Sequence, residues 1–305
     1  MSISEAEAAV DESGGRGDEP RGGLVRDALT RLRRNPAAII GAVLVLVFFF
    51  VAIFAPLLAP YEPDAADLDA IRPSFVPGPS AEHWLGLDTQ GRDELSRLIY
   101  GARQSLLVAV VSLLLGATVG STLGLLAGAF GGWVDNLVMR IVDIMLAVPG
   151  LLFAIGVAAA IGASLKAVMI AIAAVNVPVF ARLLRGSMLA QRESDYVLAA
   201  RSIGIRRRDI TLKHVLPNSV SPVIVQGTLT LATAIVDAAG LSFLGLGSAD
   251  PSVPEWGRML TEMQEALTYA PQLAAFPGLA IVLAALGFTL LGEALREALD
   301  PKFRR

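Results

Sequence analysis

Long runs of apolar residues constrain this chain more than any other feature of its sequence. The first run, residues 37–58, has no charged residue and exceeds the roughly 20 helical residues needed to cross a bilayer's hydrocarbon core. It begins too late and lasts too long to be the apolar part of a signal peptide. The chain is 54% hydrophobic and only 17% charged, which is typical of a polytopic membrane protein. The sequence therefore predicts an all-α membrane protein with six spans, at about 37–58, 105–130, 144–161, 167–184, 219–239 and 273–291.

Charged residues between the apolar runs predict how the chain is oriented. Four arginines shortly precede the first span, basic residues follow the last one, and a segment between the fourth and fifth spans is strongly basic. Lys and Arg concentrate in cytoplasmic loops, so we expect both termini and this segment in the cytoplasm. Its eight basic residues are Arg182, Arg185, Arg192, Arg201, Arg206, Arg207, Arg208 and Lys213.

The N-terminal residues precede the membrane domain, which we assign to residues 37–300. Residues 1–23 are acidic, Gly-rich and poor in large apolar side chains, and such a composition predicts a disordered cytoplasmic tail. Residues 24–36 place apolar residues on one helical face and arginines elsewhere. This pattern favours a basic amphipathic helix at the inner membrane surface, with a solvated cytosolic helix as the alternative.

Glycines recur every four residues in the second predicted span. Because residues four apart share a helical face, they form a groove that a neighbouring helix backbone can approach closely. We interpret them as a packing seam, and a role in lining a passage through the membrane stays open. The four residues are Gly116, Gly120, Gly124 and Gly128.

The basic segment also carries signals for two short helices with a sharp bend between them. Ser194 or Asp195 can cap the first helix, and Gly204 can end it in the left-handed conformation. Asp209 favours the start of the second helix through its dipole, and Pro217 stands where that helix is expected to end. The segment is either a docking element for a cytosolic partner or a solvated basic loop.

Within this segment the spacing is Ala199-Ala200, three residues, Gly204, nine residues, His214, one residue and Leu216-Pro217. This spacing resembles the EAA motif of ABC-type importer permeases, although Leu198 stands where that motif has glutamate and His214 where isoleucine is usual. The ending His-Val-Leu-Pro-Asn resembles the dipeptide and oligopeptide branch of the family. Residues 83–103 and 241–260 also resemble segments of dipeptide, oligopeptide and nickel permeases.

The resemblance implies the type I ABC importer permease fold and a "C"-type permease subunit in a bacterial cell membrane. It implies that residues 186–218 form a coupling loop that fits a groove on an ATPase subunit. The expected partners are a homologous permease in a heterodimer, two ATPase subunits that bind ATP and Mg, and an extracytoplasmic solute-binding protein, with no nucleic acid. The expected coupling residues are Ala199, Ala200, Arg201, Gly204, Arg208, Asp209, His214, Leu216 and Pro217.

Dipeptides or oligopeptides are the leading candidates for the solute, with nickel and other small solutes such as glutathione as alternatives. Two polar residues within predicted spans are candidates for the translocation path. Asn176 and Pro178 interrupt the fourth span, where a buried kink is the alternative. Asp237 lies near the outer end of the fifth span, facing either a cavity or the membrane interface.

Several activities do not fit the sequence. Its only lysines are Lys166, Lys213 and Lys302. None follows a glycine, which excludes a G-x-x-x-x-G-K-[ST] phosphate loop. With two distant histidines and no cysteine, no zinc-hydrolase pattern is present, and no G-x-S-x-G nucleophile elbow occurs. We therefore expect a non-enzymatic permease that holds no cofactor or metal, with ATP hydrolysed on separate chains.

Two other classes remain open on the residues alone. An ion-coupled secondary transporter predicts buried carboxylates near mid-membrane and often an inverted repeat, whereas Asp143 and Asp237 lie near span ends. A non-transporting membrane receptor or scaffold is the other alternative. Copurification distinguishes these classes, because only an ABC permease should bring ATPase subunits with it.

Overall fold

A computed structural model describes residues 30–70, 72 and 75–299 of the chain. Across these residues the fold is built from helices, and extended pairing is limited to isolated bridges such as that between Ala66 and Arg92. The predicted all-α class is confirmed. The predicted tail at 1–23 and most of the predicted interfacial helix at 24–36 lie outside the described residues.

Within the described residues, five helices are long and apolar enough to cross a membrane. Asn35 caps the first of them, since its side chain accepts from the amides of Ala37 and Ala38. Asp93 caps the second in the same way, accepting from the amide of Ser96 at 2.8 Å. The five helices are α3 (Pro36–Ile53), α5 (Glu94–Phe130), α8 (Leu165–Arg192), α12 (Ser221–Phe243) and α14 (Gln272–Leu299).

The third predicted span, 144–161, is not one continuous helix. The structure has α6 (Gly132–Ala147) and α7 (Gly150–Ile161), which meet at an angle of 95°. Pro149 explains the break, because proline disfavours the helical conformation of the residue before it and lacks the amide that a continuing helix needs. Val148 accordingly adopts an extended conformation, with φ −91° and ψ 133°. If the bent pair counts as one span, the described residues contain six.

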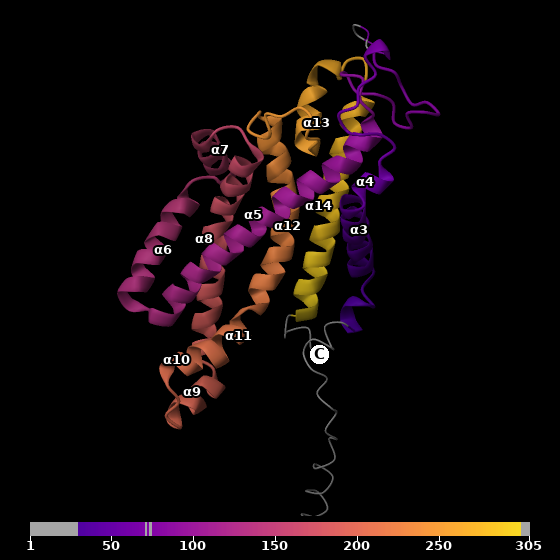
Figure 1. Ribbon diagram of the computed structural model, residues 1–305. Helices are drawn as coiled ribbons and strands as arrows, with labels where there is room; N and C mark the ends of the chain where they lie inside the picture. The colour runs from indigo at the N-terminus through magenta and orange to yellow at the C-terminus, as the bar shows by residue number, and fades with distance from the viewer. Residues whose placement is uncertain (1–29, 71, 73–74, 300–305) are drawn as a thin grey trace, which may run out of the picture.

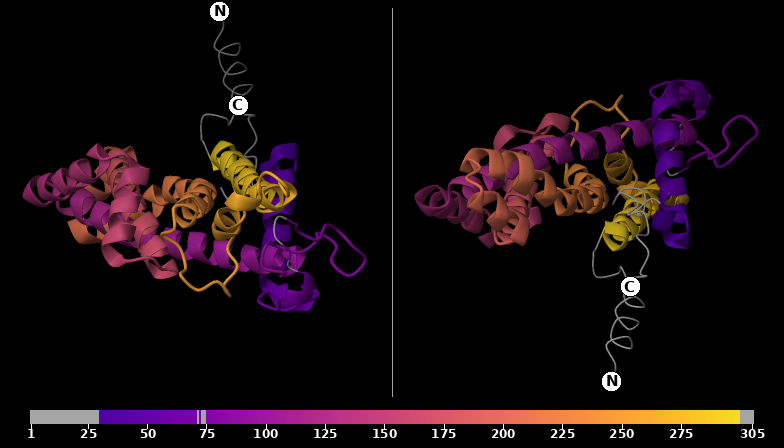
Figure 2. Two further views of the ribbon diagram at one scale, coloured as in Figure 1. Left: turned by 90° about the horizontal axis from the view of Figure 1, so that it is seen from above. Right: turned by 90° about the horizontal axis from the view of Figure 1, so that it is seen from below.

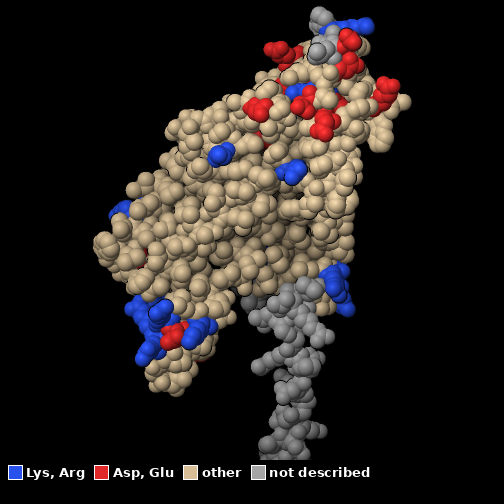
Figure 3. Space-filling view, viewed as in Figure 1, with Lys and Arg blue, Asp and Glu red and all other residues tan. Residues whose placement is uncertain are grey.

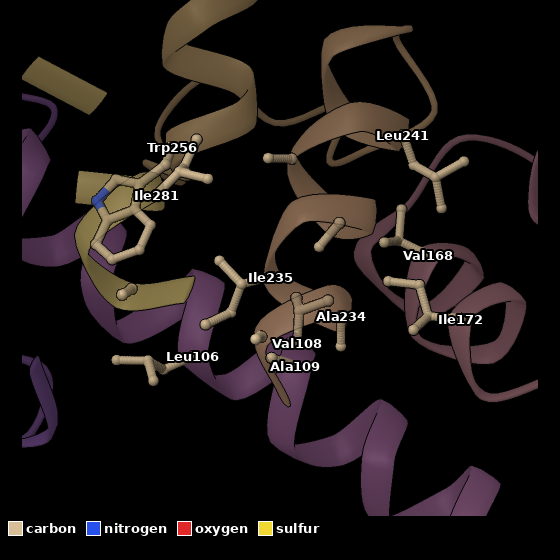
Figure 4. Packing of buried hydrophobic residues seen from close by; sticks show 14 of the residues in the cluster. Leu106, Val108, Ala109, Val168, Ile172, Ala234, Ile235, Leu241, Trp256 and Ile281 are labelled. Atoms are coloured by element: carbon tan, nitrogen blue, oxygen red, sulfur yellow. The ribbon is translucent and has the colours of Figure 1, made fainter. Parts of the chain in front are cut away.

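The long helices form an elongated bundle around the oblique helix α5. Helix α5 packs most extensively against α8, while α12 also contacts α14, α5 and α8. Seen along the bundle, α6–α8 lie at one side and α3 with α14 at the other, with α12 between them (Figures 1 and 2). The main core is formed where α5, α8, α12, α13 (Trp256–Glu262) and α14 converge, and Figure 4 shows its side chains.

The two ends of the bundle differ in charge. One end carries the segment between α4 (Ala55–Leu58) and α5, together with α13, and acidic side chains gather there (Figure 3). We call this the acidic end. The other end carries a hairpin that connects α8 to α12, and basic side chains gather on it (Figure 3). We call residues 193–219 the hairpin and this end of the bundle the hairpin end.

Candidate functional site

The hairpin extends beyond the ends of the neighbouring helices (Figure 1). It begins with α9 (Asp195–Ser202), bends, and continues through α10 (Arg207–Asp209), a π-helical segment (Ile210–Val215) and α11 (Leu216–Ser219). Gly204 lies at the bend with φ of 81°, the left-handed conformation that glycine adopts without a Cβ penalty. Its amide donates to the carbonyl of Arg201 at 3.0 Å, and the amide of Ile205 donates to that of Ala200 at 3.1 Å.

Two details, at Ser194 and Pro217, differ from the sequence interpretation. Ser194 occupies the N-cap position of α9, but its hydroxyl donates backwards to the carbonyl of Gln191 at 2.6 Å and caps nothing. Asp209 lies in the first turn of the second helical stretch, as the sequence predicts, and it pairs with Lys213 at 2.9 Å.

Pro217 does not end the second helix, because the helical path continues through α11 towards α12. The π-helical turn shifts the hydrogen bonds, so that the amide of Leu216 donates to the carbonyl of Thr211. Nearby side chains satisfy further carbonyls: Asn218 donates to that of His214 at 2.7 Å, and Ser219 donates to that of Val215 at 2.8 Å. The π-helical turn lies just before Pro217, the residue that has no amide to donate.

One face of the hairpin is buried against α8 and the other is exposed. Ala200 is 7% exposed and packs in a small core, whereas Ala199 is exposed. The free face presents Leu198, 51% exposed, and Ile203, 77% exposed. Exposed apolar side chains at the tip of a basic hairpin suit contact with another protein. The small core contains Leu184, Met188, Val197, Ala200, Ile210 and Val215, with Leu216 packed against it.

Two arginines connect this part of the chain to the end of α5. Arg192 Nη1 donates to the carbonyl of Gly128 at 2.8 Å, and Arg207 Nη2 donates to those of Ala129 and Phe130 at 3.0 and 3.3 Å. The last carbonyls of a helix lack partners within it, so guanidinium groups stabilise this end.

Two further arginines join α8 to α6 nearby. Arg185 makes two hydrogen bonds to the carboxylate of Asp135, and Arg182 pairs with Asp143 at 2.6 Å. Together with the bonds from Arg192 and Arg207, these pairs attach the hairpin and the end of α8 to both α5 and α6. A displacement of the hairpin would therefore act on three helices.

The four repeated glycines lie where α5 packs on α8. A Cβ on Gly116 would lie 2.8 Å from the carbonyl oxygen of Ala173, and one on Gly124 would lie 2.5 Å from that of Ala181. A Cβ on Gly120 would collide with the carbonyl of Val177. At these three glycines the contacts are to backbone atoms, so no side-chain rotation in α8 could relieve them, whereas a Cβ on Gly128 would meet the side chain of Met188 at 3.1 Å. The two helices are thus held at a distance that only glycine permits.

The two polar candidates for the path have different surroundings. Asn176 is 8% exposed, faces Gly116 in the α5–α8 contact, and donates to the carbonyl of Ile172 at 2.9 Å. Asp237 on α12 is half-buried, and no hydrogen bond or ion pair joins its carboxylate to another of the described residues. Asn176 therefore contributes to helix packing, whereas the carboxylate of Asp237 is available to another group.

The acidic end contains a buried ionic network that the sequence interpretation missed. Arg97, which is fully buried, and Arg92 both donate to Glu262 Oε2, at 2.8 and 2.7 Å. Arg92 Nε also donates to Asp88 at 2.6 Å, and Arg258 donates to Glu262 at 2.8 Å. The network fastens the start of α5 to α13, and it explains why both of these segments at the acidic end carry charged residues.

Trp256 of α13 reinforces this connection. Its indole Nε1 donates to the carbonyl of Leu98 at 3.0 Å, and its ring packs edge-on against Phe48 of α3. A Cβ on Gly101 would lie 2.7 Å from the indole ring. The tryptophan therefore packs directly on the backbone of α5 and joins α13 to both α3 and α5.

Glu255, next to this tryptophan, should make stability depend on pH. It is 1% exposed, accepts from Ser242 at 2.9 Å, and has a second carboxylate oxygen with no partner. Burial raises its pKa from 4.5 to about 7, opposed by the Ser242 hydroxyl and the Arg258 charge. The folded protein then holds the proton more tightly than the unfolded chain. The free energy of unfolding is therefore greatest at pH values below the unfolded-state pKa of Glu255. It decreases as pH rises through the folded-state pKa, by at most about 3 kcal/mol in total.

We expect Glu255→Gln to remove this part of the pH dependence, since glutamine is neutral throughout. Thermal unfolding of the purified protein at about pH 5 and about pH 8 measures the effect. If the unfolding temperature differs between the two pH values by as much in the variant as in the wild type, the pH dependence belongs to other groups.

Comparison with known proteins agrees with this architecture. The family described as binding-protein-dependent transport system inner membrane component matches residues 120–305. The N-terminal transmembrane domain of oligopeptide transport permease C matches residues 23–77. Together the two matches cover both ends of the membrane domain.

Two relatives match almost the whole chain. The dipeptide transport system permease protein DppC of Alkalihalophilus pseudofirmus is 46% identical over 280 residues, covering 92% of this chain and 90% of that protein. The glutathione transport system permease protein GsiD of Escherichia coli O157:H7 is 46% identical over 275 residues, covering 90% of this chain and 89% of that protein.

Among solved structures, a chain of the MetNI methionine ABC transporter matches with a TM-score of 0.53 at 19% identity. The match covers 67% of this chain and 97% of that one, and at this identity it concerns the fold alone, which is the type I permease fold. The two family matches, together with 46% identity to relatives over at least 90% of this chain, decide the assignment. This chain belongs to the binding-protein-dependent transport system inner membrane components, the permease subunits of ABC importers.

Proposed function

We propose that this permease forms half of the translocation pathway of an ATP-driven importer of dipeptides or oligopeptides, paired with a homologous permease in a heterodimer. The observation that carries the proposal is the hairpin, whose exposed apolar tip projects from the bundle while its other face packs on α8. Such a tip is suited to enter a groove on a cytosolic ATPase subunit.

In this proposal the partner ATPases bind ATP and Mg and supply the free energy. Their closure displaces the hairpin tip around Leu198 and Ile203. The core shared with α8 and the bonds from Arg192 and Arg207 to the end of α5 then pass the displacement to the membrane helices. Hydrolysis reverses the movement, and this chain itself carries no nucleotide.

The same proposal assigns the two ends of the bundle to the two sides of a bacterial cell membrane. The hairpin end and both termini are cytoplasmic, because Lys and Arg concentrate on that side. The acidic end then faces the extracytoplasmic solute-binding protein. The network of Asp88, Arg92, Arg97 and Glu262 would give that protein a rigid surface on which to dock.

A peptide is the solute best supported, because the relatives described above are named as dipeptide and glutathione permeases. The test is ATP-driven uptake by the complete transporter in proteoliposomes, together with its solute-binding protein. Uptake of labelled dipeptides or oligopeptides that requires both ATP and the binding protein supports the proposal. Uptake of nickel ions alone would redirect it to a metal importer, and uptake driven by an ion gradient without ATP would reject it.

Asp237 gives a prediction about the pathway. Because its carboxylate has no partner among the described residues, we expect Asp237→Asn to change the KM or rate of uptake while the complex assembles normally. The experiment is uptake kinetics in proteoliposomes, with Asn176→Ala as a packing control that should lower stability more than it alters KM. Unchanged kinetics in Asp237→Asn would remove this residue from the pathway.

A further inference from the structure

A groove of about 490 Å³ lies between the end of α5 and the hairpin. One side is apolar and the other carries two arginines, so the groove is amphipathic. Its main lining residues are Leu125, Leu126, Phe130, Arg207, Arg208 and Leu212.

The apolar side of the groove continues along the outer surface of α5. Leu115, Val119, Leu126 and Phe130 are 46%, 49%, 38% and 65% exposed. Their spacings of four, seven and four residues place them on one face of the helix. The groove therefore lies next to a helix face that is apolar and exposed, as a lipid-facing surface is. The apolar hairpin tip differs from this face because it lies beyond the end of the bundle.

The polar side has a cationic group with free donors. Arg208 is exposed, and no hydrogen bond or ion pair joins its guanidinium to another of the described residues. The nearest acidic residue along the hairpin, Asp209, is paired with Lys213. Arg207 commits Nη2 to the carbonyls of Ala129 and Phe130, which fixes its position at the rim of the groove. An anion at the rim would thus meet an arginine with all its donors available.

We propose that this groove binds one anionic phospholipid of the inner leaflet. The phosphate accepts hydrogen bonds from the guanidinium of Arg208, and an acyl chain lies along Leu126, Phe130 and Leu212. Arginine is well suited to phosphate because its donors match two oxygens at once, and basic pockets at the cytoplasmic ends of membrane helices recognise such headgroups. The lipid would bridge α5 and the hairpin. The inference rests on the orientation given under the proposed function.

The test uses the complete transporter, purified in detergent and depleted of lipid, with native mass spectrometry to count bound lipid. Phosphatidylglycerol should bind at low molar excess, and phosphatidylcholine should not. Arg208→Gln should weaken phosphatidylglycerol binding about tenfold, the effect of losing a charge-assisted hydrogen bond. Arg206→Gln is the matched control, because Arg206 is an exposed neighbour that does not line the groove.

Four results would overturn the lipid site. In the first, phosphatidylcholine binds as well as phosphatidylglycerol, and in the second, Arg206→Gln and Arg208→Gln lose equal amounts of phosphatidylglycerol binding. In the third, inorganic phosphate alone protects the transporter from thermal unfolding as well as phosphatidylglycerol does. In the fourth, lipid binds only after the ATPase subunits are removed. The last would give the groove to the ATPase. Uptake by the same variants is measured in parallel. If uptake still requires ATP and the binding protein while lipid selectivity is absent, only the lipid site is rejected and the proposed function stands.

Discussion

Replacing Gly120 with leucine should prevent α5 from packing on α8 and abolish the yield of assembled transporter. A Cβ at this position already collides with the carbonyl of Val177, and it would lie 2.8 Å from Cβ of Phe180. Helix α8 cannot avoid the collision by changing a rotamer, so the two helices must separate along their most extensive contact. Overpacking in a well-packed core typically costs about 1–3 kcal/mol, and a backbone collision should reach or exceed the upper end of that range.

The control for Gly120→Leu is Gly278→Leu on α14, where a Cβ would meet no atom within 4 Å. Both variants add the same apolar side chain to a membrane helix, so they differ only in the space available. We expect Gly120→Ala to show a smaller loss than Gly120→Leu. Copurification yield and thermal unfolding measure the effects, and equal behaviour of Gly120→Leu and Gly278→Leu would contradict the role of the seam.

Replacing Gly204 with valine should separate ATP hydrolysis from uptake. Gly204 has φ of 81°, and no atom lies within 4 Å of the position a Cβ would take. The substitution therefore strains the backbone without creating a collision, at a cost of about 1–3 kcal/mol. Relief of that strain would disrupt the bonds from Gly204 and Ile205 that close the bend and would reorient the hairpin tip. We expect normal assembly, residual ATPase activity and uptake reduced by about tenfold or more.

Two variants make the Gly204 result specific. Gly204→Asn should retain more uptake than Gly204→Val, because asparagine tolerates positive φ and β-branched residues do not. Gly186→Val on α8 adds the same side chain where φ is ordinary and space is open, so it should leave coupling intact. Uptake and ATPase rates measured on the same proteoliposomes give the coupling ratio. Wild-type coupling in Gly204→Val would show that the bend does not transmit movement.

Local sequence signals predicted the features of this fold that depend on neighbouring residues. Gly204 forms the bend and the glycine repeat faces another helix, because each depends on backbone geometry or on helical periodicity. The spacing of the glycines did not indicate that α8 is the helix that packs on them. The break between α6 and α7 was not predicted, although Pro149 disfavours a helical conformation at the residue before it.

Contacts between distant segments could not be predicted in the same way. Glu262 binds Arg92 and Arg97, which lie more than 160 residues earlier in the chain. Nothing in either segment alone identifies the other as its partner. The arginines of the hairpin were visible as a charge pattern, but only the fold shows that Arg192 and Arg207 reach the last carbonyls of α5.

Transmission of movement through the hairpin can be tested directly, because the chain has no cysteine of its own. Ile203→Cys introduces a single thiol at the exposed hairpin tip. In the assembled transporter, a cleavable thiol-to-amine reagent should link this thiol to an ATPase subunit. We expect ATP-driven uptake to stop when the link forms and to recover when it is cleaved. Uptake that continues at its full rate while the hairpin is linked, or a thiol at this position that reacts only from outside the cell, would contradict the account.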